Sequence, residues 1–220
     1  MKGKLIVIEG LDGSGKATQA AKLYEYLNSS KGDCIKVSFP DYSNPSSSLV
    51  KMYLDGDIAP NPQDVNAYAA SSFYAVDRYA SYMMYWKKDY EAGKTVIADR
   101  YTTANAIYQT VKLEHSKWDE FLSWLEDYEY EKLGIPKPDT VIYLDMPTEI
   151  SQKLISQRYG GDESKKDIHE KNVAFLKSCR EVALYAAEKL NWHTVKCSQG
   201  ENALSIDEIH DLIIQLIKNI

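Results

Sequence analysis

The stretch LIVIEGLDGSGKAT, residues 5–18, decides the fold. Residues 5–8 form a short apolar run that predicts a buried strand, and a helix is expected over about residues 16–27. Between them, Gly10, four residues and then Gly15-Lys16 match the spacing of a phosphate-binding loop. Glycines let successive backbone N–H groups turn onto phosphate oxygens, and the lysine reaches the β- and γ-phosphates. A strand, this loop and a helix in series indicate a nucleotide-binding α/β protein.

The last position of the loop departs from the motif. A serine or threonine normally follows the lysine and its hydroxyl meets Mg²⁺, whereas this chain has Ala17, whose methyl cannot bind a metal. Thr18 is adjacent but lies about 100° around the helix. Asp12 is the nearest carboxylate, and we hypothesise that it helps to hold Mg²⁺ directly or through water. The expected ATP-binding residues are Gly10, Asp12, Gly13, Ser14, Gly15, Lys16, Ala17 and Thr18.

Further strands and helices alternate along the chain. Apolar runs at residues 35–39, 95–98, 140–144 and 193–196 predict four more strands, and long helices are expected over about residues 63–90 and 206–217. This alternation is typical of a parallel α/β sheet flanked by helices, in one domain that spans residues 1–220. Two polar segments, residues 41–48 and 159–166, interrupt the pattern, and we interpret them as loops over a site.

Composition narrows the range of partners. The chain has 26 basic and 32 acidic residues and a net charge of −6, so no overall attraction to nucleic acid or an anionic membrane follows. An anionic ligand must therefore be bound by local positive charge. The three cysteines are far apart in the sequence and the four histidines lack metal-ligand spacing. The first apolar run is too short for a signal peptide or a membrane span, which predicts a cytoplasmic protein.

A second charged motif follows the strand predicted at residues 95–98. Asp99 and Arg100 come where a parallel sheet places its ligands, beyond the carboxyl ends of the strands. An arginine at that point can bridge donor and acceptor phosphates and neutralise the charge of the transferred group. The alternative is a surface ion pair between the two neighbouring side chains.

Five short motifs in order resemble the thymidylate kinase family. They are Glu9-Gly-Leu-Asp-Gly13, Phe39-Pro40, Phe73-Tyr-Ala-Val-Asp-Arg78, Asp99-Arg-Tyr101 and Pro136-Lys-Pro-Asp-Thr-Val141, and together they cover nearly the whole chain. The resemblance implies a five-stranded sheet of order 2-3-1-4-5, a P-loop kinase fold with a lid segment, ATP as donor with Mg²⁺, and dTMP as acceptor. Asp12 would then meet the metal or the 3′-hydroxyl of the sugar.

The resemblance also assigns the nucleoside contacts. Phe39 would border the sugar and base, Tyr74 would stack on the base, and Arg78 would hydrogen-bond a base carbonyl. Tyr74 and Arg78 are four residues apart and so share one helix face. Asn105 matches an amide that reads the base edge, and Tyr108 matches an aromatic near the sugar. Core packing is the alternative for these aromatic residues, because the chain has 17 tyrosines.

Some positions differ from the family pattern. Many members carry an arginine shortly after Phe-Pro to hold the acceptor phosphate, whereas Asp41 and Tyr42 stand here, so Tyr42 is expected to donate a hydrogen bond instead. Asp77 precedes Arg78, and its carboxylate, if turned toward the base, would favour exocyclic amino groups over a carbonyl. The choice among dTMP, dCMP, dGMP and dAMP therefore stays open from the sequence, with dTMP preferred.

Basic residues are expected in a lid over ATP. Some family members carry an arginine in the phosphate loop, and members that lack it usually place basic residues in the lid. This chain has Gly13 at that position. The lid is expected at about residues 158–170, with Arg158 and Lys165 acting on the phosphates or Arg158 stacking on adenine. Glu170 resembles a lid carboxylate that would complete a Mg²⁺ site with Asp12. A solvated charged loop is the alternative interpretation.

The predicted reaction is in-line transfer of a phosphoryl group from ATP to a nucleoside monophosphate. The expected catalytic residues are Asp12, Lys16, Arg100, Arg158 and Lys165, and the substrate contacts are Asp12, Phe39, Tyr42, Tyr74, Arg78, Asp99, Arg100, Asn105 and Tyr108. One alternative is a deoxynucleoside kinase, in which Asp41 or Asp77 would deprotonate a 5′-hydroxyl. A second is a nucleotide-binding P-loop protein without catalysis.

The helix expected over residues 63–90 also predicts a homodimer. It carries Tyr79, Tyr82, Met83, Tyr85 and Trp86, which is more apolar surface than one face of a helix needs. The resemblance implies the same assembly, so we expect two copies of the chain to pair through this helix.

Overall fold

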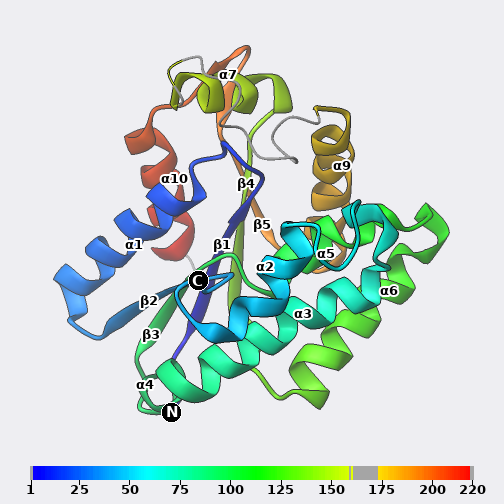
Figure 1. Ribbon diagram of the computed structural model, residues 1–220. Helices are drawn as coiled ribbons and strands as arrows, with labels where there is room; N and C mark the ends of the chain where they lie inside the picture. The colour runs from blue at the N-terminus through cyan, green and yellow to red at the C-terminus, as the bar shows by residue number, and fades with distance from the viewer. Residues whose placement is uncertain (1, 159, 161–172, 219–220) are drawn as a thin grey trace.

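A five-stranded parallel sheet forms the centre of the molecule. The computed structural model describes residues 2–158, 160 and 173–218. Its strands are β1 (Leu5–Gly10), β2 (Cys34–Ser38), β3 (Thr95–Asp99), β4 (Thr140–Asp145) and β5 (His193–Lys196). They pair in the order β2-β3-β1-β4-β5, all in parallel (Figure 1). The predicted strand order is confirmed.

Helices connect the strands. The longer ones are α1 (Lys16–Lys31), α3 (Ala67–Ser81), α6 (Trp118–Glu126), α7 (Thr148–Arg158), α9 (Val173–Lys189) and α10 (Ile206–Lys218), and the shorter ones are α2 (Ser48–Leu54), α4 (Lys87–Glu91) and α5 (Thr102–Tyr108). Two π-helical segments, Tyr82–Trp86 and Asp127–Lys132, follow α3 and α6, and a small hairpin, β6 (Ser198–Gln199) with β7 (Asn202–Ala203), precedes α10. None of the described helices is long and apolar enough to span a membrane.

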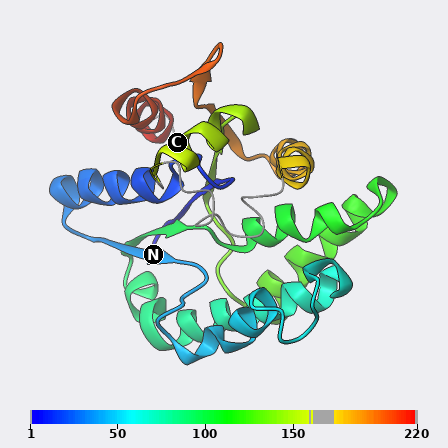
Figure 2. The ribbon, with the colours of Figure 1, turned by 45° about the horizontal axis from the view of Figure 1, so that its top comes forward.

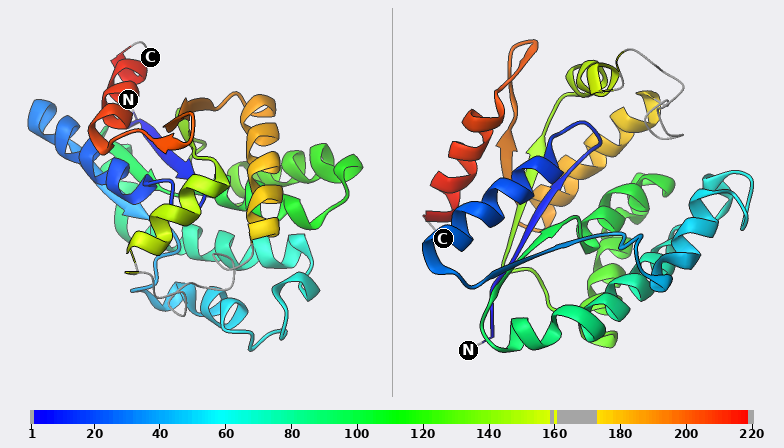
Figure 3. Two further views of the ribbon diagram at one scale, coloured as in Figure 1. Left: turned by 90° about the horizontal axis from the view of Figure 1, so that it is seen from above. Right: turned by 60° about the vertical axis from the view of Figure 1, so that its left-hand side comes forward.

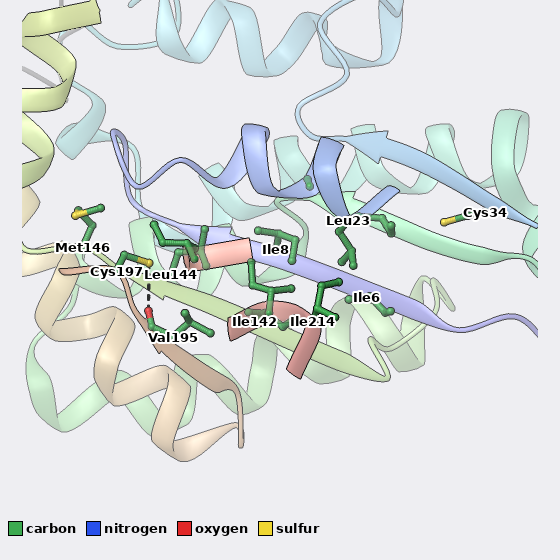
Figure 4. Close-up of a cluster of buried hydrophobic side chains, with 14 of the residues drawn as sticks. Ile6, Ile8, Leu23, Cys34, Ile142, Leu144, Met146, Val195, Cys197 and Ile214 are labelled. Carbon is green, nitrogen blue, oxygen red and sulfur yellow. Dashed lines mark hydrogen bonds between the residues drawn. The ribbon is translucent and has the colours of Figure 1, made fainter. Parts of the chain in front are cut away.

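The helices cover both faces of the sheet. Figures 2 and 3 show α1 and α10 on one side of the strands and α3, α5 and α6 on the other. The α1/α10 face buries a cluster that includes Ile8, Leu23, Ile142 and Ile213, part of which is drawn in Figure 4. Because both faces are covered, the central strands β1 and β4 are buried at every position, as expected for parallel strands.

The expected long helix starts later than predicted. Residues Pro62–Asp64 form a separate 3₁₀ turn, and α3 begins only at Ala67 because the Asn66 side chain accepts a hydrogen bond from Ala69 N at 2.9 Å and caps the helix. After α3, the π-helical segment Tyr82–Trp86 continues into α4 without a break. The expected start near Gln63 was therefore wrong, whereas the continuous helical run to Glu91 agrees with the prediction.

The carboxyl ends of the central strands meet at one edge of the sheet. The loop of residues 10–16 follows β1, and Arg100 follows β3, which pairs directly with β1. The expected lid begins at Arg158, the last residue of α7, whereas Lys165 and Glu170 lie outside the described residues. The edge thus brings the phosphate loop and the Asp99-Arg100 motif together, as parallel pairing requires.

Candidate active site

A cavity of about 370 Å³ opens beside the carboxyl ends of β1 and β3. Ten of the residues selected from the sequence line it: Asp12, Lys16, Phe39, Tyr42, Tyr74, Arg78, Asp99, Arg100, Asn105 and Tyr108. They come from the phosphate loop, the segment after β2, α3, the end of β3 and α5. One cavity therefore joins the expected phosphate-binding residues to the expected nucleoside-binding residues.

The phosphate loop adopts the backbone shape that its glycines allow. Gly13 has a φ of 79° and Gly15 a φ of 84°, in the left-handed region that other residues rarely enter. A Cβ on Gly13 would also lie 2.8 Å from Ser151 O on α7, so the loop packs closely against that helix. Ala17 and Thr18 are exposed on α1, and the Ser14 hydroxyl is buried without a partner among the described residues.

A cluster of opposite charges lies at the phosphate end of the cavity. The Asp12 carboxylate accepts from Lys16 Nζ at 3.2 Å, from Arg100 Nη2 at 2.6 Å and from the Tyr108 hydroxyl at 3.3 Å. Burial alone would raise the pKa of Asp12, but the two cations outweigh it and lower that pKa well below its ordinary value. The pKa of Lys16 is lowered by burial and by the charge of Arg100.

Glu9 contacts Arg100 and was not predicted as a site residue from the sequence. It is fully buried, accepts from the Thr103 hydroxyl at 2.6 Å and lies 3.7 Å from Arg100 Nη1. Burial raises the pKa of Glu9, although Arg100 and Thr103 oppose that shift. Arg100 itself has a φ of 64°, an unusual value for a residue with a side chain. The signal in the sequence that could have identified Glu9 was a glutamate directly after the apolar run of residues 5–8.

The end of the cavity that is expected to take a nucleoside is aromatic and polar. The ring of Tyr74 meets that of Tyr53 edge-on, with centroids 6.2 Å apart. Lys112 Nζ donates to the Tyr53 hydroxyl at 2.8 Å and to Val65 O at 3.0 Å, and both Tyr53 and Lys112 line the cavity. Neither was selected from the sequence, because nothing local distinguishes them from other core tyrosines and surface lysines.

Arg78 lines the cavity and also forms an ion pair with the buried Glu129. It is 2% exposed and forms a fork with Glu129, at 2.7 Å from Nε and 2.5 Å from Nη2. Although burial opposes it, the Glu129 carboxylate raises the pKa of Arg78 above its ordinary value. Asn105 Nδ2 also donates to Glu129, at 3.3 Å. Glu129 lies in a run of charged residues that resembles a solvated surface, so the sequence carried no signal for it.

Asp77 and Asp41 do not line the cavity. Asp77 is 1% exposed and accepts from Asp41 N at 2.9 Å and from the Ser46 hydroxyl at 2.6 Å. Asp41 accepts from Ser43 and Asn44 side chains in the same loop. Both carboxylates therefore stabilise the loop after β2. Asp77 is turned away from the position from which it would select an amino group on a base.

Two carboxylates of the cavity fit a magnesium ion. Asp99 Oδ1 is buried and has no hydrogen-bond partner among the described residues, and Asp12 lines the same cavity. The described residues contain no group of three or more His, Cys, Asp and Glu side chains suited to a metal. Mg²⁺ commonly binds through one or two carboxylates together with water and substrate phosphates, so a pair of this kind is sufficient.

Comparisons with known proteins identify the family of the chain. The family model described as thymidylate kinase matches residues 8–212. Thymidylate kinase of Caenorhabditis elegans is 28% identical over all of this chain and 92% of its own length, and a probable thymidylate kinase of Methanosarcina acetivorans is 30% identical over 99% and 96%. The solved structure of Candida albicans thymidylate kinase matches 99% of this chain and 92% of its own with a TM-score of 0.70 and 22% identity. The chain therefore belongs to the thymidylate kinase family.

Proposed function

We propose that this protein transfers the γ-phosphoryl group of ATP to dTMP and releases ADP and dTDP. The observation that carries the proposal is the single cavity, in which Lys16 and Arg100 stand at the phosphate end and Tyr74, Arg78 and Asn105 at the other. Such a cavity can hold a nucleotide with its phosphate against the cations and its base among the aromatic and amide groups. Family membership and the names of the relatives support the same reaction.

Lys16 and Arg100 supply positive charge to the reaction. The acceptor is a phosphate oxygen that is already anionic at neutral pH, so no general base is needed. Arg100 is fixed by Asp12, Glu9 and the Tyr108 ring, whose centroid lies 5.2 Å from its guanidinium carbon. It can therefore hold donor and acceptor phosphates in line and neutralise the charge that spreads over the transferred group.

Asp12 and Asp99 are the described residues that would hold Mg²⁺ beside the phosphates. A bound Mg²⁺ would neutralise phosphate charge and orient the two phosphates for transfer. Ala17 contributes no oxygen, so the carboxylates have to replace the hydroxyl that the usual motif supplies. We retain Arg158, Lys165 and Glu170 as candidate lid residues. Lys165 and Glu170 lie outside the described residues, so the candidacy of these three rests on the sequence.

The deoxynucleoside kinase alternative is less favoured. That reaction needs a carboxylate that removes a proton from a 5′-hydroxyl. Asp41 and Asp77, the two candidates from the sequence, are bound to the loop of residues 41–46 and do not line the cavity. Glu9 is fully buried, lies 3.7 Å from Arg100 Nη1 and accepts a hydrogen bond from the Thr103 hydroxyl. These contacts support a phosphate acceptor over a hydroxyl acceptor.

A homodimer through α3 and the following π-helical segment is also proposed. Five apolar side chains are more than a third exposed there: Val76, Tyr79, Met83, Met84 and Tyr85. The prediction was wrong for Tyr82 and Trp86, which are 6% and 1% exposed and pack against Val96 and Tyr101 in the core. The remaining exposed side chains form a patch of the kind that pairs with a second copy. A cytoplasmic location stays a prediction.

A panel of acceptors tests the reaction. Release of ADP should be measured with ATP and Mg²⁺ against the four common deoxynucleosides and their 5′-monophosphates. We expect turnover with dTMP and none with thymidine. Turnover with nucleosides only would assign the chain to the deoxynucleoside kinases, and nucleotide binding without any turnover would make it a non-catalytic P-loop protein.

A further inference from the structure

Glu129 lies at the centre of a buried hydrogen-bond network behind the nucleoside end of the cavity. It is fully buried in the π-helical segment Asp127–Lys132. Its Oε2 accepts from Arg78 Nε, and its Oε1 accepts from both Arg78 Nη2 and Asn105 Nδ2. One carboxylate therefore contacts both Arg78 and Asn105, the two side chains expected to hydrogen-bond the edge of a base.

The Asn105 amide is held in one orientation. Its nitrogen donates to Ser71 O at 3.1 Å and to Glu129 Oε1 at 3.3 Å. A backbone carbonyl and an ionised carboxylate are both acceptors only, so the nitrogen must face them and the amide cannot be reversed. Because Asn105 lines the cavity, its Oδ1 is the atom left for a ligand. Asn105 can thus offer an acceptor and no donor.

Arg78 complements this acceptor with donors. Of its five N–H groups, two are taken by Glu129 and one by Tyr101 O at 3.3 Å. Two N–H groups have no acceptor among the described residues, and Arg78 lines the cavity beside Asn105. An acceptor next to a donor matches a base edge on which an N–H lies beside a carbonyl. Among the pyrimidines, thymine and uracil present that edge, and cytosine presents the reverse.

We propose that Glu129 is the positioning residue for base selection, because it fixes both the Asn105 amide and the Arg78 guanidinium so that only a base with an N–H beside a carbonyl is bound well. The proposal rests on the proposed function of the same cavity and adds the residue that sets its choice of base. Glu129 itself does not line the cavity, so its effect reaches the substrate through Arg78 and Asn105.

The variant E129Q should change that choice. A carboxamide offers one acceptor oxygen where the carboxylate offers two. Its NH₂ group must replace either Oε2, where it meets Arg78 Nε, or Oε1, where it meets both Arg78 Nη2 and Asn105 Nδ2. Either arrangement loses a contact that fixes Arg78. An NH₂ group in place of Oε1 also allows the Asn105 amide to reverse and to turn its own NH₂ group toward the cavity, where it suits the N3 acceptor of cytosine. Ser71 O opposes the reversal, so we expect reduced discrimination rather than a complete inversion.

The test is a competition between dTMP and dCMP for limiting enzyme with ATP and Mg²⁺. The ratio of their kcat/KM values does not depend on how much of the variant is folded. We expect E129Q to lower the dTMP:dCMP ratio about tenfold or more, with dUMP still following dTMP. E129D retains the charge that Arg78 needs but withdraws from the longer contact to Asn105, so its ratio should also fall.

The matched control is D145N. Asp145 is another nearly buried carboxylate that forms a fork with an arginine, at 2.7 and 2.9 Å from Arg180, and it does not line the cavity. D145N should lower the free energy of unfolding without changing the dTMP:dCMP ratio of kcat/KM values. An unchanged ratio in both E129Q and E129D overturns the proposal, and so does an equal fall in D145N. If the wild type turns over no monophosphate, the proposed reaction is wrong, and calorimetric binding of dTMP and dCMP to the same variants still decides the role of Glu129.

Discussion

Arg100 Nη2 donates to Asp12 Oδ1 at 2.6 Å across 88 positions of the sequence. The contact joins the end of β3 to the phosphate loop, and Lys16 approaches the same carboxylate at 3.2 Å. One carboxylate therefore contacts both of the cations that would bind a phosphate. Asp12 thus links the phosphate loop to the end of β3 through both cations.

Replacing Asp12 by asparagine should separate anion binding from catalysis. Without the carboxylate, Lys16 and Arg100 lose their competing partner, so pyrophosphate without Mg²⁺ should bind several-fold tighter by calorimetry. At the same time kcat should fall about 100-fold, because a metal contact is lost. D207N is the control, since Asp207 pairs with Lys22 on the surface. Weaker pyrophosphate binding in D12N would contradict this account of the pair.

Lys16 and Lys22 offer a matched comparison on α1. Lys16 lines the cavity, whereas Lys22 pairs with the exposed Asp207 at 2.9 Å. K16M should lower kcat/KM for ATP about 1000-fold, because its charge is aimed at the phosphates in a partly buried site. K22M should stay within about twofold of the wild type. If kcat/KM for ATP fell equally in both variants, the total charge of α1 would determine activity and the position of Lys16 would not.

Gly13 and Gly200 separate backbone strain from crowding. Both have positive φ, 79° and 59°, so an alanine is strained at either position. Only at Gly13 would the added Cβ meet another atom, Ser151 O at 2.8 Å, whereas nothing lies within 4 Å at Gly200. G200A should cost about 1 kcal/mol of unfolding free energy. G13A should cost more by urea denaturation and should also weaken ATP binding. Equal effects would show that the loop does not depend on contact with α7.

Lys112 should make stability depend on pH. Burial lowers its pKa from 10.5 to about 8. Between pH 8 and 10.5 the unfolded chain therefore binds more protons, and this group makes the free energy of unfolding rise with pH, by about 1–2 kcal/mol after allowing for its partial exposure. Urea midpoints measured across this range should rise more steeply for the wild type than for K112M.

Lys117 is a control whose pKa is shifted in the opposite direction to that of Lys112. Its hydrogen bond to Glu120, at 2.8 Å, raises its pKa, so the small stability that it adds is lost as pH rises. K117M should therefore leave the rise of the wild type intact. If K112M retains the full rise, Lys112 is not the group responsible.

Met84 tests the proposed dimer. It is 67% exposed in the π-helical segment after α3 and is the most exposed of the five apolar side chains in the patch. M84R should convert a dimer into a monomer by light scattering, because an unpaired charge at a contact costs more than it does in water. L184R on α9 places the same charge on a residue that is 37% exposed outside the patch and should remain dimeric. A monomeric wild type would refute the dimer.

The sequence by itself determined the elements of the fold and one end of the site. The five strands were predicted to within two residues at each end, because apolar runs and glycine turns are local signals. Lys16 and Arg100 were found for the same reason: each follows a recognisable strand, and parallel strands end at one edge. Other cavity residues, such as Tyr74, Arg78, Asn105 and Tyr108, were selected through the resemblance to a known family.

Only the tertiary structure decided what surrounds those residues. Glu129 and Arg78 are 51 positions apart, and no local pattern distinguishes a buried glutamate from its solvated neighbours. The direction of Asp77, away from the cavity, depends on hydrogen bonds from a loop far along the chain. Tyr82 and Trp86 are buried in a cluster with Val96 and Tyr101, which come from other parts of the chain. Burial and hydrogen-bond partners arise from chain segments that meet only on folding, so sequence periodicity names the residues that can act and packing decides which atoms face the substrate.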